Sequence, residues 1–194
     1  MIWGCLAAAV SVPILIAARS PLLQWRQPIY IVGGFAGIVS LAAMLCQPLL
    51  VGGYLPGLPT RRGRRVHRVV GTVVVLSVVV HVAGLWITSP PDMIDALTFS
   101  APTAFSAFGV ISMWMLFAAA GLALARRRIG IRSWRAGHAS FVSLAVLTAV
   151  AHAMLIEGTM GMVSKAVLCL LVLIATGKVM ADLKIWRSFR GRNM

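Results

Sequence analysis

The chain has 194 residues, of which 60% are hydrophobic and 11% are charged, and its mean hydropathy is +0.93. Soluble domains contain about 45–50% apolar and about 25% charged residues, so this composition excludes an ordinary soluble domain and a disordered chain. The 18 basic and 4 acidic residues give a net charge of +14, but the basic residues lie between long apolar runs. We therefore expect the lipid bilayer as a partner, and no nucleic acid.

Six apolar stretches approach or reach the length of about 20 residues that crosses a bilayer. In chain order they are residues 2–18, 29–50, 66–87, 104–125, 138–156 and 162–180. The first has no basic segment before its apolar run, so we interpret it as a membrane span rather than a cleaved signal peptide. Together the stretches predict one all-α domain over residues 1–194. This is a polytopic bundle of six transmembrane helices without a soluble flavin or nucleotide domain.

The basic residues gather on one side of the predicted bundle. They occupy the segments between spans two and three and between spans four and five, and the tail after the last span, with Arg68 just inside span three and Lys178 at the end of span six. These residues are Arg61, Arg62, Arg64, Arg65, Arg68, Arg126, Arg127, Arg128, Arg132, Arg135, Lys178, Lys184, Arg187, Arg190 and Arg192. By the positive-inside rule, this side and both termini lie in the cytoplasm. We expect a multi-pass protein of the inner (plasma) membrane of a bacterium.

The chain has only four histidines, which form two equally spaced pairs. They are His67 and His81 in the third span, and His138 and His152 in the fifth. A separation of 14 residues is close to four helical turns, so both members of a pair face the same way, about 21 Å apart along the axis. Spans three and five run parallel, and we consider the arrangement in which they face each other. His67 then meets His138 near the cytoplasm, and His81 meets His152 toward the outer side.

Paired histidines at two levels of a membrane bundle point to haem. Neutral imidazole binds iron well, and haem iron commonly takes axial histidine. Two opposed histidines occupy both axial positions of one haem b, so two levels predict two stacked haems that conduct electrons across the bilayer. Zinc sites use closer ligand spacing, and the three cysteines show no zinc-type spacing. The alternative is that the histidines only bond between packed helices.

Two features around the histidines allow two interpretations each. Arg65, Arg68 and Arg135 are placed to pair with the propionates of an inner haem, or they only set the topology. Gly71 and Gly84 follow a histidine by about one turn. They either leave room for a flat macrocycle or allow close packing of helices.

Two segments resemble the ferric reductase-like transmembrane domain. The run from Arg64 to Gly71, RRVHRVVG, followed by His81, resembles the third helix of that domain. The run WRAGH, which ends at His138 and is followed by His152, resembles its fifth helix. The family includes ferric reductases, NADPH oxidases and the haem-binding membrane subunit of a bacterial methionine-sulfoxide reductase system.

The resemblance implies a b-type cytochrome that carries electrons outward as the membrane subunit of an oxidoreductase, without catalytic residues of its own. It implies that His67 and His138 hold the iron of an inner haem, and His81 and His152 that of an outer haem. No GxGxxG loop is present, so the donor would be a cytoplasmic flavin reductase, or a flavin (FMN or FAD) at the cytoplasmic face. The acceptor would be ferric iron, oxygen or a periplasmic reductase.

Two other functions are compatible with the sequence. A quinone-linked cytochrome b subunit of a membrane dehydrogenase or hydrogenase would also hold haem through histidines, although no quinone motif is evident. A haem-free structural or transport protein would use the histidines only at helix contacts. The low number of charged residues inside the spans argues against an ion-coupled transporter.

Overall fold

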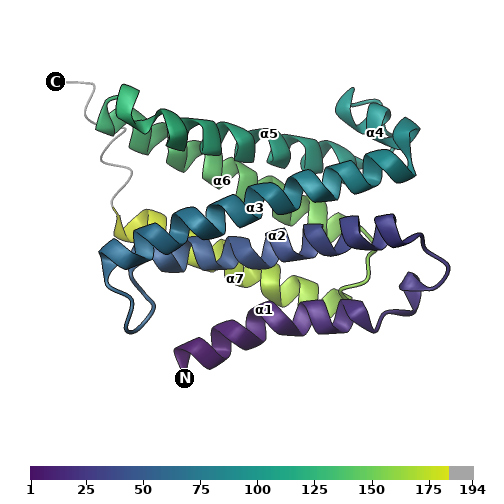
Figure 1. Cartoon of the computed structure of the whole chain (residues 1–194), viewed down its shortest axis with the longest axis horizontal. Coiled ribbons are helices and arrows are strands. Elements are labelled where there is room, and N and C mark those ends of the chain that lie inside the picture. The colour runs from purple at the N-terminus through teal and green to yellow at the C-terminus, as the bar shows by residue number, and fades with distance from the viewer. Residues whose placement is uncertain (184–194) are drawn as a thin grey trace.

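The computed structural model describes residues 1–183, and that range contains helices and connecting segments but no strand. Its six long helices alternate in direction (Figure 1). They are α1 (Ile2–Ala18), α2 (Pro28–Gly52), α3 (Thr60–Thr88), α5 (Ala104–Leu124), α6 (Ile131–Leu155) and α7 (Met162–Asp182). A short helix α4 (Pro90–Leu97) and the 3-10 turns η1 (Pro21–Leu23) and η2 (Ala125–Arg128) lie in the connections. The all-α prediction is confirmed.

Five helices, α2, α3, α5, α6 and α7, are long and apolar enough to cross a membrane. The chain is therefore a multi-pass membrane protein. Helix α1 is apolar but has 17 residues, which rise about 25 Å against a hydrocarbon thickness of about 30 Å. The sixth span and the cytoplasmic placement of both termini stay predictions. Four of the basic residues expected in the cytoplasm lie outside the described residues: Lys184, Arg187, Arg190 and Arg192.

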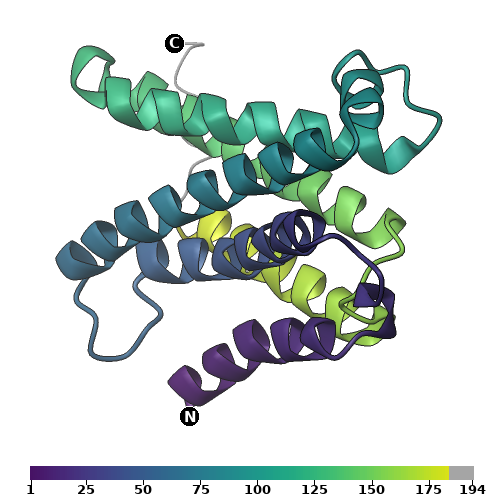
Figure 2. The same ribbon diagram turned by 45° about the vertical axis from the view of Figure 1, so that its right-hand side comes forward.

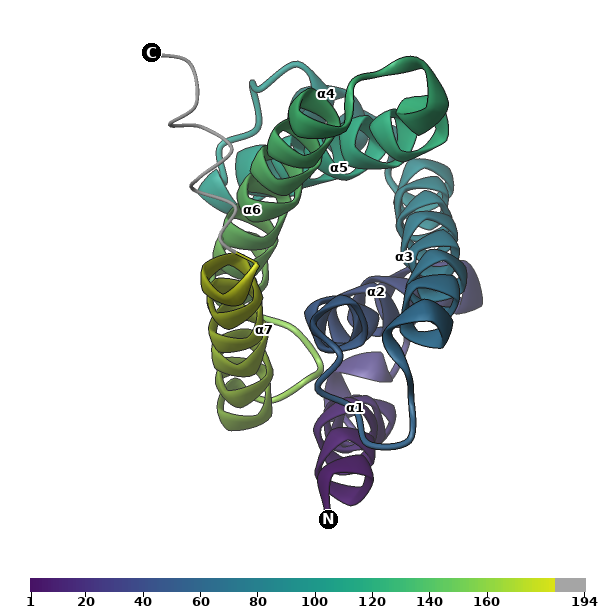
Figure 3. The ribbon, with the colours of Figure 1, turned by 90° about the vertical axis from the view of Figure 1, so that its left-hand side faces the viewer.

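The long helices form a ring when the bundle is seen end-on. Its order is α2, α3, α5, α6 and α7, and α1 lies outside against α2 and α7 (Figure 3). The most extensive contacts join α2 to α3 and α5 to α6. Each of these pairs is an antiparallel hairpin, and Figure 2 shows α5 at the top of the bundle and α1 at the bottom. Helices α3 and α6 therefore belong to different hairpins and run in the same direction.

The main apolar core lies between α1, α2, α6 and α7. Among its fully buried residues, α3 contributes only Val74. Helix α3 is instead held to α2 by a close backbone approach, because a Cβ on Gly84 would lie 3.0 Å from the Cα of Gly33. Gly84 thus allows close packing of two helices. Most of the inward face of α3 remains outside the core, and this face carries the candidate site.

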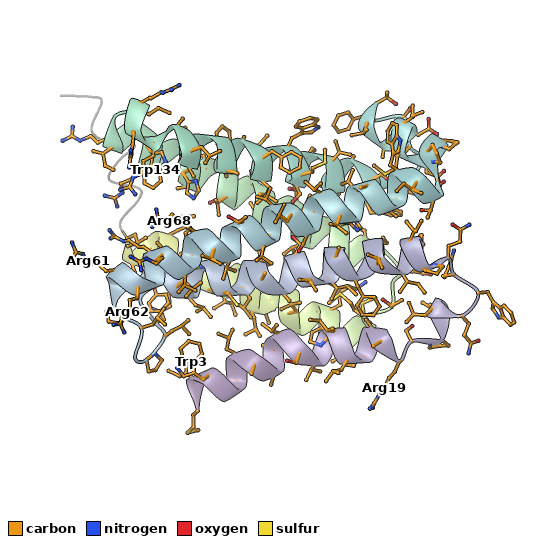
Figure 4. All side chains as sticks on the ribbon, viewed as in Figure 1. Trp3, Arg19, Arg61, Arg62, Arg68 and Trp134 are labelled. Carbon is orange, nitrogen blue, oxygen red and sulfur yellow. The ribbon has the colours of Figure 1, made fainter. Side chains whose placement is uncertain are left out.

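Two helices begin earlier than the hydropathy pattern predicts. Helix α3 starts at Thr60, so the arginines that we placed in a loop form its first turns, and α6 starts at Ile131. Arginine is a good helix former, and its charge lowers hydropathy without ending the helix. Arg61, Arg62 and Arg68 lie at the same end of the bundle as Trp134, whereas Arg19 lies at the other end (Figure 4).

The segment between α3 and α5 contains the short helix α4. The start of this helix has recognisable signals. Pro90 occupies the first turn, where a missing backbone N–H costs nothing. Ser89 Oγ donates a 2.5 Å hydrogen bond to the Asp92 carboxylate, which lies favourably at the positive end of the helix dipole. The two prolines at residues 90–91 mark the beginning of a helix rather than an extended break.

The loop between α2 and α3 is fixed from two sides at the arginine-rich end. Tyr54 donates its hydroxyl proton to Asp182 Oδ2 over 2.5 Å, and Asp182 also pairs with Lys178 at 2.8 Å. Trp3 Nε1 donates to the carbonyl of Pro56 over 3.1 Å. These contacts attach the start of α3 to both α1 and α7.

The Tyr54 contact gives a titration test of this loop. Partial burial, the hydrogen bond to Asp182 and the charge of Asp182 raise the pKa of Tyr54 from its ordinary 10.0 to about 12. We expect Asp182→Asn to lower this pKa toward 10.0, measured by tyrosinate absorbance in a Tyr30→Phe background that leaves Tyr54 as the sole tyrosine. Because the folded pKa exceeds the unfolded pKa, the stabilisation is complete below pH 10 and is lost as the pH rises through 12. An unchanged midpoint in Asp182→Asn would contradict the contact.

Candidate functional site

The structure places all four histidines on the two parallel helices of the ring. His67 and His81 lie on α3, and His138 and His152 lie on α6. All four are half-buried. The ring centroids of His81 and His152 are 6.4 Å apart and the ring planes are inclined by 76°.

Each outer histidine is anchored to the backbone of its own hairpin. His81 Nδ1 lies 2.8 Å from the carbonyl oxygen of Gly33 in α2, and His152 Nδ1 lies 2.8 Å from that of Phe105 in α5. A carbonyl oxygen only accepts hydrogen bonds, and it keeps a second lone pair beside its helical bond. The imidazole Nδ1 therefore carries the proton and donates it.

Each inner histidine also lies close to a backbone carbonyl, 14 residues from the outer histidine of the same helix. His138 Nδ1 lies 3.1 Å from the carbonyl oxygen of Ala119 in α5. His67 Nδ1 lies 3.3 Å from that of Gln47 in α2, which is the longest of the four distances. In the first hairpin a histidine and its carbonyl partner are 20 or 48 residues apart, and in the second 19 or 47. The two hairpins are thus copies of one arrangement.

Two glycines make room for the outer imidazoles. A helical side chain covers the turn that precedes its own Cα, so the residue four positions after an acceptor shields its carbonyl. These positions hold Gly37 and Gly109. A Cβ on Gly37 would lie 2.9 Å from His81 Nδ1, and a Cβ on Gly109 would lie 2.7 Å from His152 Nδ1. We did not predict either glycine, although their similar separations from the paired histidines, 44 residues for Gly37 and 43 for Gly109, are a readable signal.

The hydrogen bond from Nδ1 to a carbonyl determines which ring nitrogen of each outer histidine can bind a metal ion. A neutral imidazole carries one proton, so a ring that donates from Nδ1 has a bare lone pair on Nε2, on the far side of the ring. Histidines that bind metals almost always donate their other N–H to a carbonyl or carboxylate, which fixes the ring and raises its basicity. The outer pair therefore has the chemistry of two opposed metal ligands.

The donors come in pairs rather than in larger groups. Within residues 1–183, no three His, Cys, Asp or Glu side chains converge as a metal-ligand set. Each pair of histidines supplies two nitrogen donors. This arrangement suits axial ligation of a macrocycle better than a four-ligand zinc site.

An aromatic and cationic stack connects the inner level to the arginine-rich end. The Trp134 ring is stacked on His138, with centroids 5.5 Å apart and planes inclined by 14°. The Arg126 guanidinium lies 4.7 Å from the centroid of Trp134. Arg135, a candidate propionate partner, instead donates to the Leu183 carbonyl over 3.3 Å at the end of α7. The other two candidates, Arg65 and Arg68, are exposed on α3.

The fold and the site define a class of membrane protein. It is a polytopic helical bundle that carries opposed histidines on two parallel helices. Residues 34–150, more than half of the chain, match the family described as ferric reductase like transmembrane component. The chain belongs to this family, which makes it a membrane component associated with an oxidoreductase. The matched range includes three of the histidines and ends two residues before His152. No curated protein and no solved structure matches the chain.

Gly109 provides a test of the anchored ring. Gly109→Ala is expected to displace His152, and overpacking of this kind costs about 1–3 kcal/mol. Gly121→Ala in the same helix is the matched control, because a Cβ there meets nothing within 4 Å. We expect only Gly109→Ala to lower the thermal unfolding temperature in detergent and to shift the ¹⁵N resonances of one histidine. Equal behaviour of the two variants would contradict the described contact.

Proposed function

We propose that the chain is a b-type cytochrome that carries electrons across the membrane through two haems, each held between two histidines. Membership in the ferric reductase like family supports a transmembrane electron-transfer role, and such domains generally bind haem. The observation that carries the proposal is the repeated imidazole–carbonyl bond, which leaves Nε2 of His81 and of His152 bare in two rings whose centroids lie 6.4 Å apart.

The spacing of the outer pair fits axial ligation of one metal ion. Metal–nitrogen bonds to histidine are about 2 Å long. C–N bonds of about 1.33 Å put a ring nitrogen about 1.1 Å from the centroid of a five-membered ring. Two imidazoles on opposite sides of one ion therefore have centroids about 6 Å apart, and His81 and His152 are 6.4 Å apart.

The inner pair, His67 and His138, would hold the second haem. The Nε1–H of Trp134, whose ring is stacked on His138, is buried and has no hydrogen-bond partner among the described residues. A buried donor of this kind calls for an acceptor, and the carboxylate of a haem propionate is one. Arg126 over the same indole adds positive charge beside that position.

Haem supplies one-electron redox chemistry when it is bound. The chain orients the imidazoles, leaves Nε2 of His81, His138 and His152 free to bind iron, and sets the two levels about 21 Å apart along α3 and α6. The arginine-rich end would receive electrons, since its positive field attracts an acidic flavoprotein or a flavin phosphate. The end with α4 would pass them to ferric iron, oxygen or a periplasmic reductase. We place the protein in the plasma membrane of a bacterium, with the arginine-rich end in the cytoplasm.

The decisive experiment is a haem assay on protein purified in mild detergent. We expect about two haems b per chain by pyridine haemochrome, with a low-spin reduced spectrum typical of two axial histidines. Colourless protein from haem-replete cells would overturn the proposal in favour of a haem-free membrane protein. Reduction by quinol but not by reduced flavin would overturn the assigned donor in favour of a quinone-linked cytochrome.

Loss of one ligand tests the assignment of the outer level. His81→Ala is expected to reduce the haem content from about two to about one per chain, because one axial ligand is missing. It should also abolish electron transfer from an enclosed flavin donor to an external ferric chelate in vesicles. Val80→Ala is the matched control, because Val80 is exposed on α3. Full haem content in His81→Ala would contradict the assignment.

A further inference from the structure

One side chain breaks the repeat between the two hairpins. Gln47 in α2 and Ala119 in α5 occupy equivalent positions, since each offers its carbonyl to an inner histidine. Only Gln47 adds a terminal amide, which reaches the stretch of α3 between His67 and Gly71. Gly71 permits this approach, as a Cβ there would already lie 3.4 Å from the amide. The inner level therefore has a polar group that the outer level lacks.

The backbone of α3 determines which way this amide points. One terminal atom of Gln47 lies 2.7 Å from the backbone nitrogen of Gly71, and the other lies 3.2 Å from the carbonyl oxygen of His67. An N–H requires an acceptor and a carbonyl requires a donor. The amide oxygen therefore faces Gly71, and the amide nitrogen donates to the His67 carbonyl.

This orientation also decides the state of the His67 ring. The Gln47 amide nitrogen is within hydrogen-bonding distance of His67 Nδ1 and turns an N–H toward it. His67 Nδ1 therefore accepts a hydrogen bond, whereas Nδ1 of the other three histidines donates. The competing carbonyl, at 3.3 Å, is the most distant of the four. A neutral imidazole that accepts at Nδ1 carries its proton on Nε2.

We propose that Gln47 is a positioning residue that holds His67 in the tautomer opposite to that of the other three histidines until haem binds. A protonated Nε2 has no lone pair for iron. Ligation by His67 therefore requires one proton to leave Nε2, one to be taken up at Nδ1, and the amide to turn over so that its oxygen accepts from Nδ1–H. The total charge does not change. The amide then loses its contacts with α3, so the inner site binds haem more weakly than it would without Gln47.

The tautomer is measured without haem, so this test does not depend on the proposed function. The full chain, labelled with ¹⁵N-histidine and produced without haem, is examined by long-range ¹H–¹⁵N NMR. We expect three rings protonated at Nδ1 and one at Nε2. Gln47→Met keeps the side-chain length without donor or acceptor, and should give four rings protonated at Nδ1. Gln24→Met, in an exposed connecting segment, should match the wild type. Four identical tautomers in the wild type, or an unchanged spectrum in Gln47→Met, would refute the proposal.

The consequence for the inner site rests on the proposed function and is measured separately. In a His81→Ala background only the inner pair remains complete. We expect Gln47→Met to bind haem about fivefold more tightly there, the factor that corresponds to one net hydrogen bond. Equal affinities would refute the effect of Gln47 on the site. Absence of haem binding in every chain would refute the proposed function, while the NMR result would still decide the tautomer.

Discussion

The hydrogen bond from an imidazole to a backbone carbonyl of the next helix governs the central part of this structure. A polar N–H inside a bilayer finds no water, so an acceptor must be supplied by the protein. Two such contacts, 14 residues apart along α5, join each end of α5 to α6 through His152 and His138. A slide of one helical turn would break both contacts. The same bonds that orient the histidine rings therefore also fix the register of the α5–α6 hairpin.

The sequence predicted the features that depend on side-chain periodicity and charge. The apolar stretches, the arginine-rich end and the paired histidines of α3 and α6 are of this kind. The start of α3 at Thr60 was missed because a hydropathy pattern responds to arginine side chains and not to backbone hydrogen bonds. The acceptors at Gly33 and Phe105 were missed because every residue has a carbonyl, and only the tertiary contact selects one. The role of Gly37 could be assigned only after the contact between His81 and the Gly33 carbonyl was known.

Packing and the candidate chemistry are divided between different helices. The family match covers most of the two hairpins but neither α1 nor α7. These two outlying helices, with α2 and α6, enclose the main apolar core. They also hold the arginine-rich end together through Trp3 and Asp182. Helix α3 joins that core only through Val74, so its histidines lie on a face that is not part of the core. The apolar core and the facing histidine pairs thus occupy different parts of the bundle.

The division into hairpins has a consequence for biosynthesis. Each hairpin forms from contacts between helices that are adjacent in the chain, so it folds through local contacts, which form rapidly. Each hairpin by itself contains both rings of one helix but only half of every facing pair. The α2–α3 hairpin leaves the ribosome first and has its imidazoles anchored while their partners are still unmade. Completion of the facing histidine pairs therefore requires both hairpins and is a late event of assembly.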